Sequence, residues 1–198
     1  MFSFNSTYEL PIGPGKAFGN GLQGAGRQVL AGWQLGGIVS LRSGFAETVM
    51  LSNRLANFGV VEDSPDLAAG ASNNPTKGVS IGCAGIPQGT RVGTPDLWYD
   101  PCAFVLPPAN ALGNLGRNTL TMPGRATVDL SLMKNFDIKE AAKLQFRFEA
   151  FNLFNHTNLG TPARTVRNTS GVRNATAGRI DTTVGTPRQL QFALKLSF

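Results

Sequence analysis

The sequence predicts an all-β protein whose antiparallel strands are of the kind that span an outer membrane, joined by long external loops. About five segments alternate apolar and polar side chains, as lipid outside and water inside a barrel require. There is no run of about 18 apolar residues, which excludes a helical membrane protein. The mean hydropathy of -0.05 suits strands in which only every second residue is apolar. With 24 glycines and 15% charged residues, almost no helix is expected.

Two strands are expected near the start of the chain, at residues 2–10 and 28–42. Both alternate in polarity, and their apolar sides consist of Phe2, Phe4, Tyr8 and Leu10, and of Val29, Ala31, Trp33, Leu35, Val39 and Leu41. Glycines at 32, 36 and 37 interrupt the second strand, where a bend or a close approach of two backbones is expected.

A hairpin is expected next, from a strand at about 125–134, a polar connection at 135–142 and a strand ending at about residue 150. The apolar residues of both strands are even-numbered, so the register must pair even positions with even positions. Asp129 should then face Arg147 or Glu149, and opposite charges favour Arg147.

The last eleven residues form the clearest strand of all. Their apolar side consists of Leu190, Phe192, Leu194, Leu196 and Phe198, and the chain stops on that last aromatic residue.

The connections alternate in length, which predicts the orientation in the membrane. Residues 43–124 and 156–185 are long and are assigned to the outside, whereas 11–27 and 135–142 are shorter and are assigned to the periplasm. Carboxylates in the first long loop could hold calcium, although their spacing matches no EF-hand: Glu62, Asp63, Asp66, Asp96 and Asp100. Trp98 and Tyr99 lie in the same loop and serve either to stack on a sugar or to pack the loop.

Cys83 and Cys102 also lie in the long first loop. A disulfide between them fits an oxidising compartment, and two free thiols are the alternative. Two thiols and one distant histidine are too few for a metal site, so no metal and no cofactor is expected.

The net charge of +6 does not indicate a nucleic-acid partner, because the basic residues are scattered and no basic helix accompanies them. A solvated loop face or a mildly cationic lumen accounts for the charge. The single histidine, His156, is expected in a turn at the end of a strand, and no nucleophile–base pair is apparent. The protein is therefore not expected to be an enzyme.

Five strands cannot close a barrel, since the smallest known barrels have about eight. Residues 1–198 are therefore expected to be the C-terminal segment of a larger barrel, an interpretation that also accounts for the missing secretory signal. The polar sides of the strands should then face the lumen, and the candidates for contact with solute or plug are Asp129, Gln145, Arg147, Glu149, Gln191 and Lys195.

Five strings carry a resemblance to a known family: VLAGWQLGGIVSLRSG, LWYDPCAF, LGNLGRNTLTMPGRATVDLSLMKNFDI, KLQFRFEAFNLFNHTN and GRIDTTVGTPRQLQFALKLSF. Together they resemble the C-terminal barrel of TonB-dependent receptors, in particular the Oar-like subgroup with a carboxypeptidase-regulatory-like N-terminal domain. The resemblance covers nearly the whole chain outside residues 50–95.

The resemblance implies a barrel of about 22 strands with an internal plug, which imports a solute across the outer membrane of a Gram-negative type bacterium. The implied partners are outer-membrane lipid, the missing N-terminal barrel and plug, TonB through that missing part, and the barrel assembly machinery. The barrel assembly machinery would recognise the terminal signal formed by Phe192, Leu194, Leu196 and Phe198. Two other functions stay open, a surface binding or adhesion protein and a soluble β-sandwich binding module.

Overall fold

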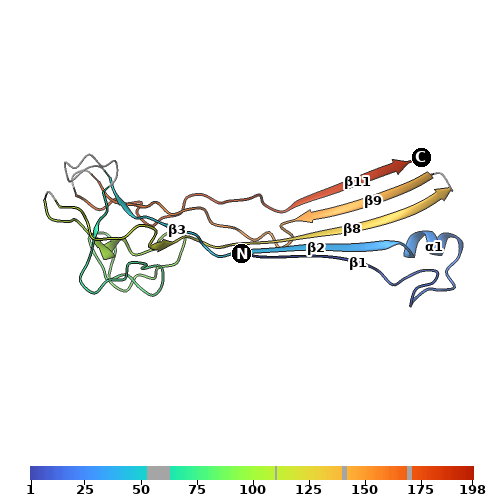
Figure 1. Cartoon of the computed structure of the whole chain (residues 1–198), viewed down its shortest axis with the longest axis horizontal. Helices are drawn as coiled ribbons and strands as arrows, with labels where there is room; N and C mark the ends of the chain where they lie inside the picture. Colours follow the sequence, from blue (N-terminus) through green and yellow to red (C-terminus); the bar gives the residue numbers. More distant parts are fainter. Residues whose placement is uncertain (53–62, 110, 140–141, 169–170) are drawn as a thin grey trace. The chain divides into compact units, whose positions relative to one another are not determined.

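The computed structural model describes residues 1–198 apart from 53–62, 110, 140–141 and 169–170 (Figure 1). The chain divides into two compact units. The first, here called the sheet unit, consists of residues 1–42, 125–157 and 185–198. The second, here called the loop unit, consists of residues 43–124 and 158–184.

The sheet unit is one antiparallel sheet in the order β1-β2-β8-β9-β11. Its strands are β1 (Phe2–Glu9), β2 (Trp33–Arg42), β8 (Arg125–Lys139), β9 (Ala142–Phe151) and β11 (Gln189–Ser197). Each of the five expected strands is present, so the predicted all-β, antiparallel class is confirmed.

The register keeps the apolar side chains on one face of the sheet. Phe148 lies opposite Leu132 on one neighbouring strand and opposite Phe192 on the other. The predicted pairing of even with even positions is therefore confirmed. Side chains alternate across a strand, so the odd-numbered residues of β8, β9 and β11 form the opposite, polar face.

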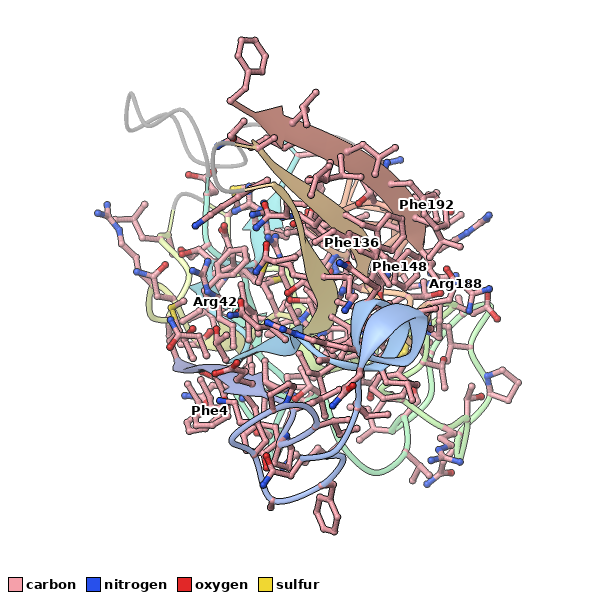
Figure 2. All side chains as sticks on the ribbon, turned by 90° about the vertical axis from the view of Figure 1, so that its right-hand side faces the viewer. Phe4, Arg42, Phe136, Phe148, Arg188 and Phe192 are labelled. Carbon is pink, nitrogen blue, oxygen red and sulfur yellow. A yellow bond between two sulfur atoms is a disulfide. The ribbon has the colours of Figure 1, made fainter. Side chains whose placement is uncertain are left out.

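The apolar face is not covered by a core: its large residues on β1, β2 and β11 are mostly exposed, and those on the central strands β8 and β9 are mostly half-buried. Leu194 is 71% and Phe192 is 67% exposed. The ring centroids of Phe148 and Phe192 lie 5.1 Å apart, so these aromatic residues lie side by side on neighbouring strands, and Phe148 is half-buried (Figure 2). More than a third of the surface of each of these other apolar side chains of the same face is also exposed: Phe2, Phe4, Tyr8, Leu35, Leu41, Leu190 and Leu196. A soluble sandwich would bury such a face.

The connection before β2 differs from the prediction. Residues expected to begin the second strand form the short helix α1 (Gly24–Leu30), so Val29 and Ala31 are not strand residues. Gly32 has φ +75°, a conformation that glycine adopts easily, and it turns the chain from the helix into β2. Within β2, a Cβ on Gly36 would lie 2.4 Å from the hydroxyl oxygen of Ser131 on β8, so the close contact at this glycine is with a side chain rather than with the neighbouring backbone.

The other end of the hairpin also differs, because β8 continues to Lys139 and the connection to β9 is shorter than expected. Among the described residues, no helix is long and apolar enough to cross a bilayer.

The loop unit is folded, although residues 43–124 were expected to be mostly irregular. Its elements are β3 (Ala46–Glu47), β4 (Met50–Leu51), β5 (Asp66–Leu67), the 3₁₀ helix η1 (Pro101–Ala103), β6 (Phe104–Val105), β7 (Leu120–Thr121) and β10 (Thr165–Arg167). The pairs β3–β7 and β5–β6 are antiparallel, whereas β4–β10 is parallel and joins the two long connections.

A hydrophobic core of its own holds the loop unit together. It consists of Val49, Leu51, Tyr99, Ala103, Phe104, Leu115, Leu120, Met122, Val166 and Ala177. Tyr99 is fully buried, packs edge-on against Phe104 with centroids 6.0 Å apart, and donates its hydroxyl to the Ala163 carbonyl at 2.7 Å. Of the two roles considered for Tyr99, packing of the loop is the one observed.

Replacement of Leu194 by Arg tests whether the apolar face meets lipid. In a bilayer the change should lower the free energy of unfolding by about 2–4 kcal/mol, because a cation would be placed near the middle of the apolar layer. If Leu194 faced water instead, the same substitution would change the free energy of unfolding by less than about 0.5 kcal/mol. The measurement is urea unfolding of the protein in lipid vesicles. The control is Gln191→Arg, since Gln191 lies on the polar face opposite Glu149. Equal effects of the two changes would contradict the assignment of faces.

Tyr99 should make the loop unit sensitive to alkali. Burial raises the pKa of Tyr99 above its ordinary value of 10.0, so its contribution to stability is complete below about pH 10 and is lost as the pH rises toward the folded-state pKa. Tyr99→Phe should remove this alkaline loss and lower the free energy of unfolding by about 1–3 kcal/mol at neutral pH, because the Ala163 carbonyl loses its donor.

Urea unfolding followed by Trp98 fluorescence, in a Trp33→Phe background, measures both effects. Tyr8→Phe is the control, since Tyr8 is 56% exposed. An unchanged alkaline profile in Tyr99→Phe would refute the prediction.

Candidate functional site on the polar face of the sheet

The polar face of β9 and β11 carries five of the six residues that the sequence singled out for the lumen. They line one cavity of about 300 Å³ together with Ala193, and they are Gln145, Arg147, Glu149, Gln191 and Lys195. The cavity exists because the strands are antiparallel neighbours with a register that sets Gln191 opposite Glu149 and Lys195 opposite Gln145.

The charges of this cavity are partly paired. A guanidinium nitrogen of Arg147 lies 3.7 Å from a carboxylate oxygen of Glu149, two residues along the same strand, and the side chains are 43% and 23% exposed. Lys195 has no ion-pair partner among the described residues. Two cations and one carboxylate therefore line the cavity, which gives it a positive balance suited to attracting an anionic group.

The amide side chain of Gln145 is held in place from the neighbouring strand. Its Nε2 donates to Oδ1 of Asn135 at 2.9 Å. The two residues are direct partners in the β8–β9 register. One wall of the cavity is thus fixed by a hydrogen bond between strands.

Asp129 does not join the other five residues, and its predicted pairing with Arg147 is wrong. Arg147 lies opposite Met133, and Glu149 lies opposite Ser131. Asp129 lies nearer the start of β8, where its Oδ1 accepts a hydrogen bond from the backbone N–H of Asn152 at 2.8 Å. The apolar contacts and the short hairpin connection set the register, since one exposed charge pair contributes only about 0.2–1 kcal/mol.

Asn152 organises the turn that follows β9. It has φ 49°, a conformation that Asn tolerates better than most residues. Its side-chain amide donates to the carbonyls of His156 at 3.0 Å and Thr186 at 3.1 Å, and its Oδ1 accepts from the His156 backbone N–H at 2.9 Å. His156 thus lies just after the turn at residues 152–154, and it is bonded through its main chain.

Lys134 is a feature that the sequence analysis missed. Its even number places it on the apolar face, yet it is only 1% exposed. Its Nζ donates to the Ala31 carbonyl and lies 5.6 Å from the centroid of the Trp33 ring and 5.0 Å from that of Phe136. Aromatic faces and a carbonyl oxygen are favourable neighbours for an ammonium group. A lysine within an otherwise apolar even-numbered series was the signal that could have revealed this cluster.

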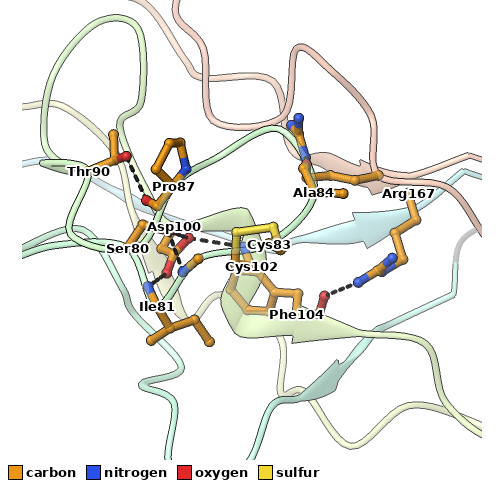
Figure 3. The surroundings of a disulfide bond; sticks show 12 residues. Ser80, Ile81, Cys83, Ala84, Pro87, Thr90, Asp100, Cys102, Phe104 and Arg167 are labelled. Atoms are coloured by element: carbon orange, nitrogen blue, oxygen red, sulfur yellow. Dashed lines mark hydrogen bonds between the residues drawn. A yellow bond between two sulfur atoms is a disulfide. The ribbon is translucent and has the colours of Figure 1, made fainter.

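Cys83 and Cys102 are joined by a disulfide, with Cα atoms 5.5 Å apart (Figure 3). The adjacent Asp100 is 2% exposed. Its carboxylate accepts hydrogen bonds from the Ser80 hydroxyl at 2.8 Å, from the Ile81 N–H at 2.8 Å and from the Cys102 N–H at 3.0 Å. The carboxylate and the disulfide thus tie the same two segments of the loop unit together.

The calcium hypothesis finds no support in the described carboxylates. Asp100 uses its oxygens within the chain, and Asp66 accepts from the Asn114 N–H at 2.7 Å. Glu62 lies outside the described residues. In the part of the chain that the structure describes, no three His, Cys, Asp or Glu residues are grouped so that they could hold a metal ion.

The residues predicted to form the terminal assembly signal lie at an edge of the sheet. Phe192, Leu194 and Leu196 are on the apolar face of β11, and Phe198 follows the strand and is 99% exposed. Their exposure leaves them accessible to a partner.

Substitutions at Asp129 test the observed register. Asp129→Ala should lower the free energy of unfolding by about 1–3 kcal/mol, because the partly buried N–H of Asn152 loses its acceptor. Asp129→Asn retains an oxygen at this position and should cost less. Urea unfolding in detergent gives both values. A double-mutant cycle supplies the check: a coupling above about 0.5 kcal/mol between Asp129 and Arg147 would show that these residues pair after all.

Comparison with known proteins agrees with the geometry of the sheet. The family model described as "Outer membrane beta barrel domain" matches residues 1–191. No curated protein and no solved structure is significantly similar to the chain. The matched region includes all of the first four strands of the sheet and the start of β11, together with the whole loop unit. The chain belongs to the outer membrane β-barrel domain family.

Proposed function

We propose that the protein acts in the outer membrane as part of a TonB-dependent transporter or receptor of the Oar-like subgroup. This chain would supply wall, lumen lining and external loops for the uptake of a solute. The observation that carries the proposal is the sheet with one exposed apolar face and one polar face, on which five lumen candidates line a single cavity. The five strings that resemble this receptor group add support.

The sheet also supports the idea that more strands complete the wall. β1 and β11 are its edge strands, and each has a neighbour on one side only among the described residues. Unpaired edges of this kind are unstable in a membrane, where every backbone N–H and C=O needs a partner. We propose that a longer parent protein provides the missing strands, an internal plug and the segment that contacts TonB, in an outer membrane of the Gram-negative type.

Different surfaces of the chain would meet different partners in this proposal. The apolar face would contact lipid. Arg147, Glu149 and Lys195 would offer hydrogen bonds to plug or solute, and the terminal residues that end at Phe198 would be read by the barrel assembly machinery. The role is binding and transport rather than catalysis, without a cofactor.

A second candidate is a surface binding or adhesion protein. The observation that favours it is the loop unit, which has its own core and a disulfide and therefore forms an ordered surface. Adhesion would need the loop unit but neither TonB nor a plug.

Uptake can be separated from adhesion even while the solute is unidentified. The parent gene is deleted in one strain and TonB is inactivated in another, and the solutes left in a complex growth medium are compared by mass spectrometry. Uptake predicts that the same solute remains in both media, because binding without TonB energy does not import it. A double variant, Arg147→Gln with Lys195→Gln, should reduce uptake of an anionic solute while the protein still assembles in the outer membrane.

The opposite result would be equally informative. If surface attachment is lost on deletion, persists without TonB, and no solute accumulates in either medium, adhesion replaces uptake as the function.

A further inference from the structure

The loop unit contains a cavity of its own, formed within residues 76–121. Its volume is about 660 Å³, within the range of roughly 300–1,000 Å³ that is usual for sites of small organic molecules. It is lined by Thr76, Lys77, Gly78, Val79, Arg91, Val92, Gly93, Trp98 and Thr121. None of these residues belongs to the polar face of the sheet, and sugar stacking by Trp98 is still an open alternative.

Trp98 is held rigidly at this cavity. Its indole N–H donates to the Thr121 carbonyl at 2.8 Å, and its backbone N–H donates to the Gly178 carbonyl at 2.7 Å. The side chain is partly buried and packs against the core of the loop unit while it also lines the cavity. A ring fixed in this way loses little freedom when a ligand stacks on it.

Hydrogen bonds also hold other parts of the cavity wall. Val79 and Arg91 form an antiparallel bridge, and the Val92 N–H donates to the Gly78 carbonyl at 3.2 Å. Thr121 is fixed by Asn74, whose Oδ1 accepts from the Thr121 N–H at 3.0 Å and whose amide donates to the Thr121 hydroxyl oxygen at 2.9 Å. The Thr121 hydroxyl keeps its own hydrogen to donate.

Two cations complete the site. Lys77 and Arg91 are exposed, and neither makes an ion pair with a described residue. No carboxylate is among the described residues that line the cavity. The positive charge is therefore available to a ligand, and the planar guanidinium of Arg91 suits a carboxylate, which it can bind through two parallel hydrogen bonds.

We propose that this cavity binds the acidic sugar units of a polysaccharide or oligosaccharide. The C–H groups on one face of a sugar ring carry partial positive charge and match the negative face of an indole ring such as Trp98. The sugar carboxylate would pair with Arg91 and Lys77, and the hydroxyls of Thr76 and Thr121 would bond sugar hydroxyls. A simple anion would use the cations but not the aromatic ring, and a neutral sugar would use the ring but leave the cations without a partner.

The proposal concerns binding alone and holds for a transporter or an adhesin. The test uses the full chain in detergent, with Trp33→Phe so that only Trp98 fluoresces. Trigalacturonate, a hyaluronan tetrasaccharide and sialyllactose are titrated separately, each beside its neutral methyl ester and beside inorganic phosphate. At least one acidic sugar should change Trp98 fluorescence with saturation, its ester should bind at least about tenfold more weakly, and added salt should weaken binding.

Charge variants locate the site. Lys77→Gln and Arg91→Gln should each weaken binding of the acidic sugar by about tenfold or more. Arg117→Gln is the matched control, because Arg117 is an exposed cation of the same unit that does not line the cavity. Protease resistance of the loop unit shows that each variant is folded.

Several results would overturn the proposal. They are the absence of binding by all three acidic sugars, equal binding of acid and ester, competition by phosphate at the same concentration as the sugar, and equal loss of binding in Arg117→Gln. None of these results bears on uptake, so the failure of this proposal would leave the proposed transport function to be judged by its own experiment.

Discussion

The structure of the sheet depends on where its large apolar side chains go. In the described chain the large apolar side chains contact mainly their neighbours on the same face. Residues such as Phe192 and Leu194 are mostly exposed. Water is a poor environment for so much apolar surface, whereas the acyl chains of lipid are a good one. If one face contacts lipid, its residues must be apolar at every second position, and the residues between them form the polar face. This requirement also determines the register of the strands.

The loop unit obeys a different rule, because its apolar residues pack against one another. Tyr99, Phe104 and Leu120 are fully buried, and the Cys83–Cys102 disulfide with the Asp100 hydrogen bonds ties neighbouring segments together. Short strands alone would not hold such a unit, since two-residue ladders supply few hydrogen bonds. The core also holds Trp98, which packs against it.

The sequence predicted the strands well because a period of two can be recognised from local residues alone. The predictions from sequence were wrong where the structure depends on contacts between residues that are far apart in the chain. Charge alone predicts that Asp129 faces Arg147, whereas the register follows from packing along the whole hairpin. The alternation of apolar and polar residues predicts a strand from residue 28, but residues 24–30 form a helix that ends just before the turn at Gly32. The loop core was not recognised because its members are spaced irregularly over two connections, so neither periodicity nor composition marks them.

The shared core of the loop unit has a consequence for how such proteins diversify. Leu51 comes from the first long connection and Val166 from the second, and the parallel pairing of β4 with β10 joins the two connections directly. An insertion or a hybrid that alters one connection must therefore suit the other. β8 and β9 lie between the two connections in the chain. A recombination event that exchanges both connections between two genes must therefore exchange this hairpin as well, so the three segments are inherited as one block.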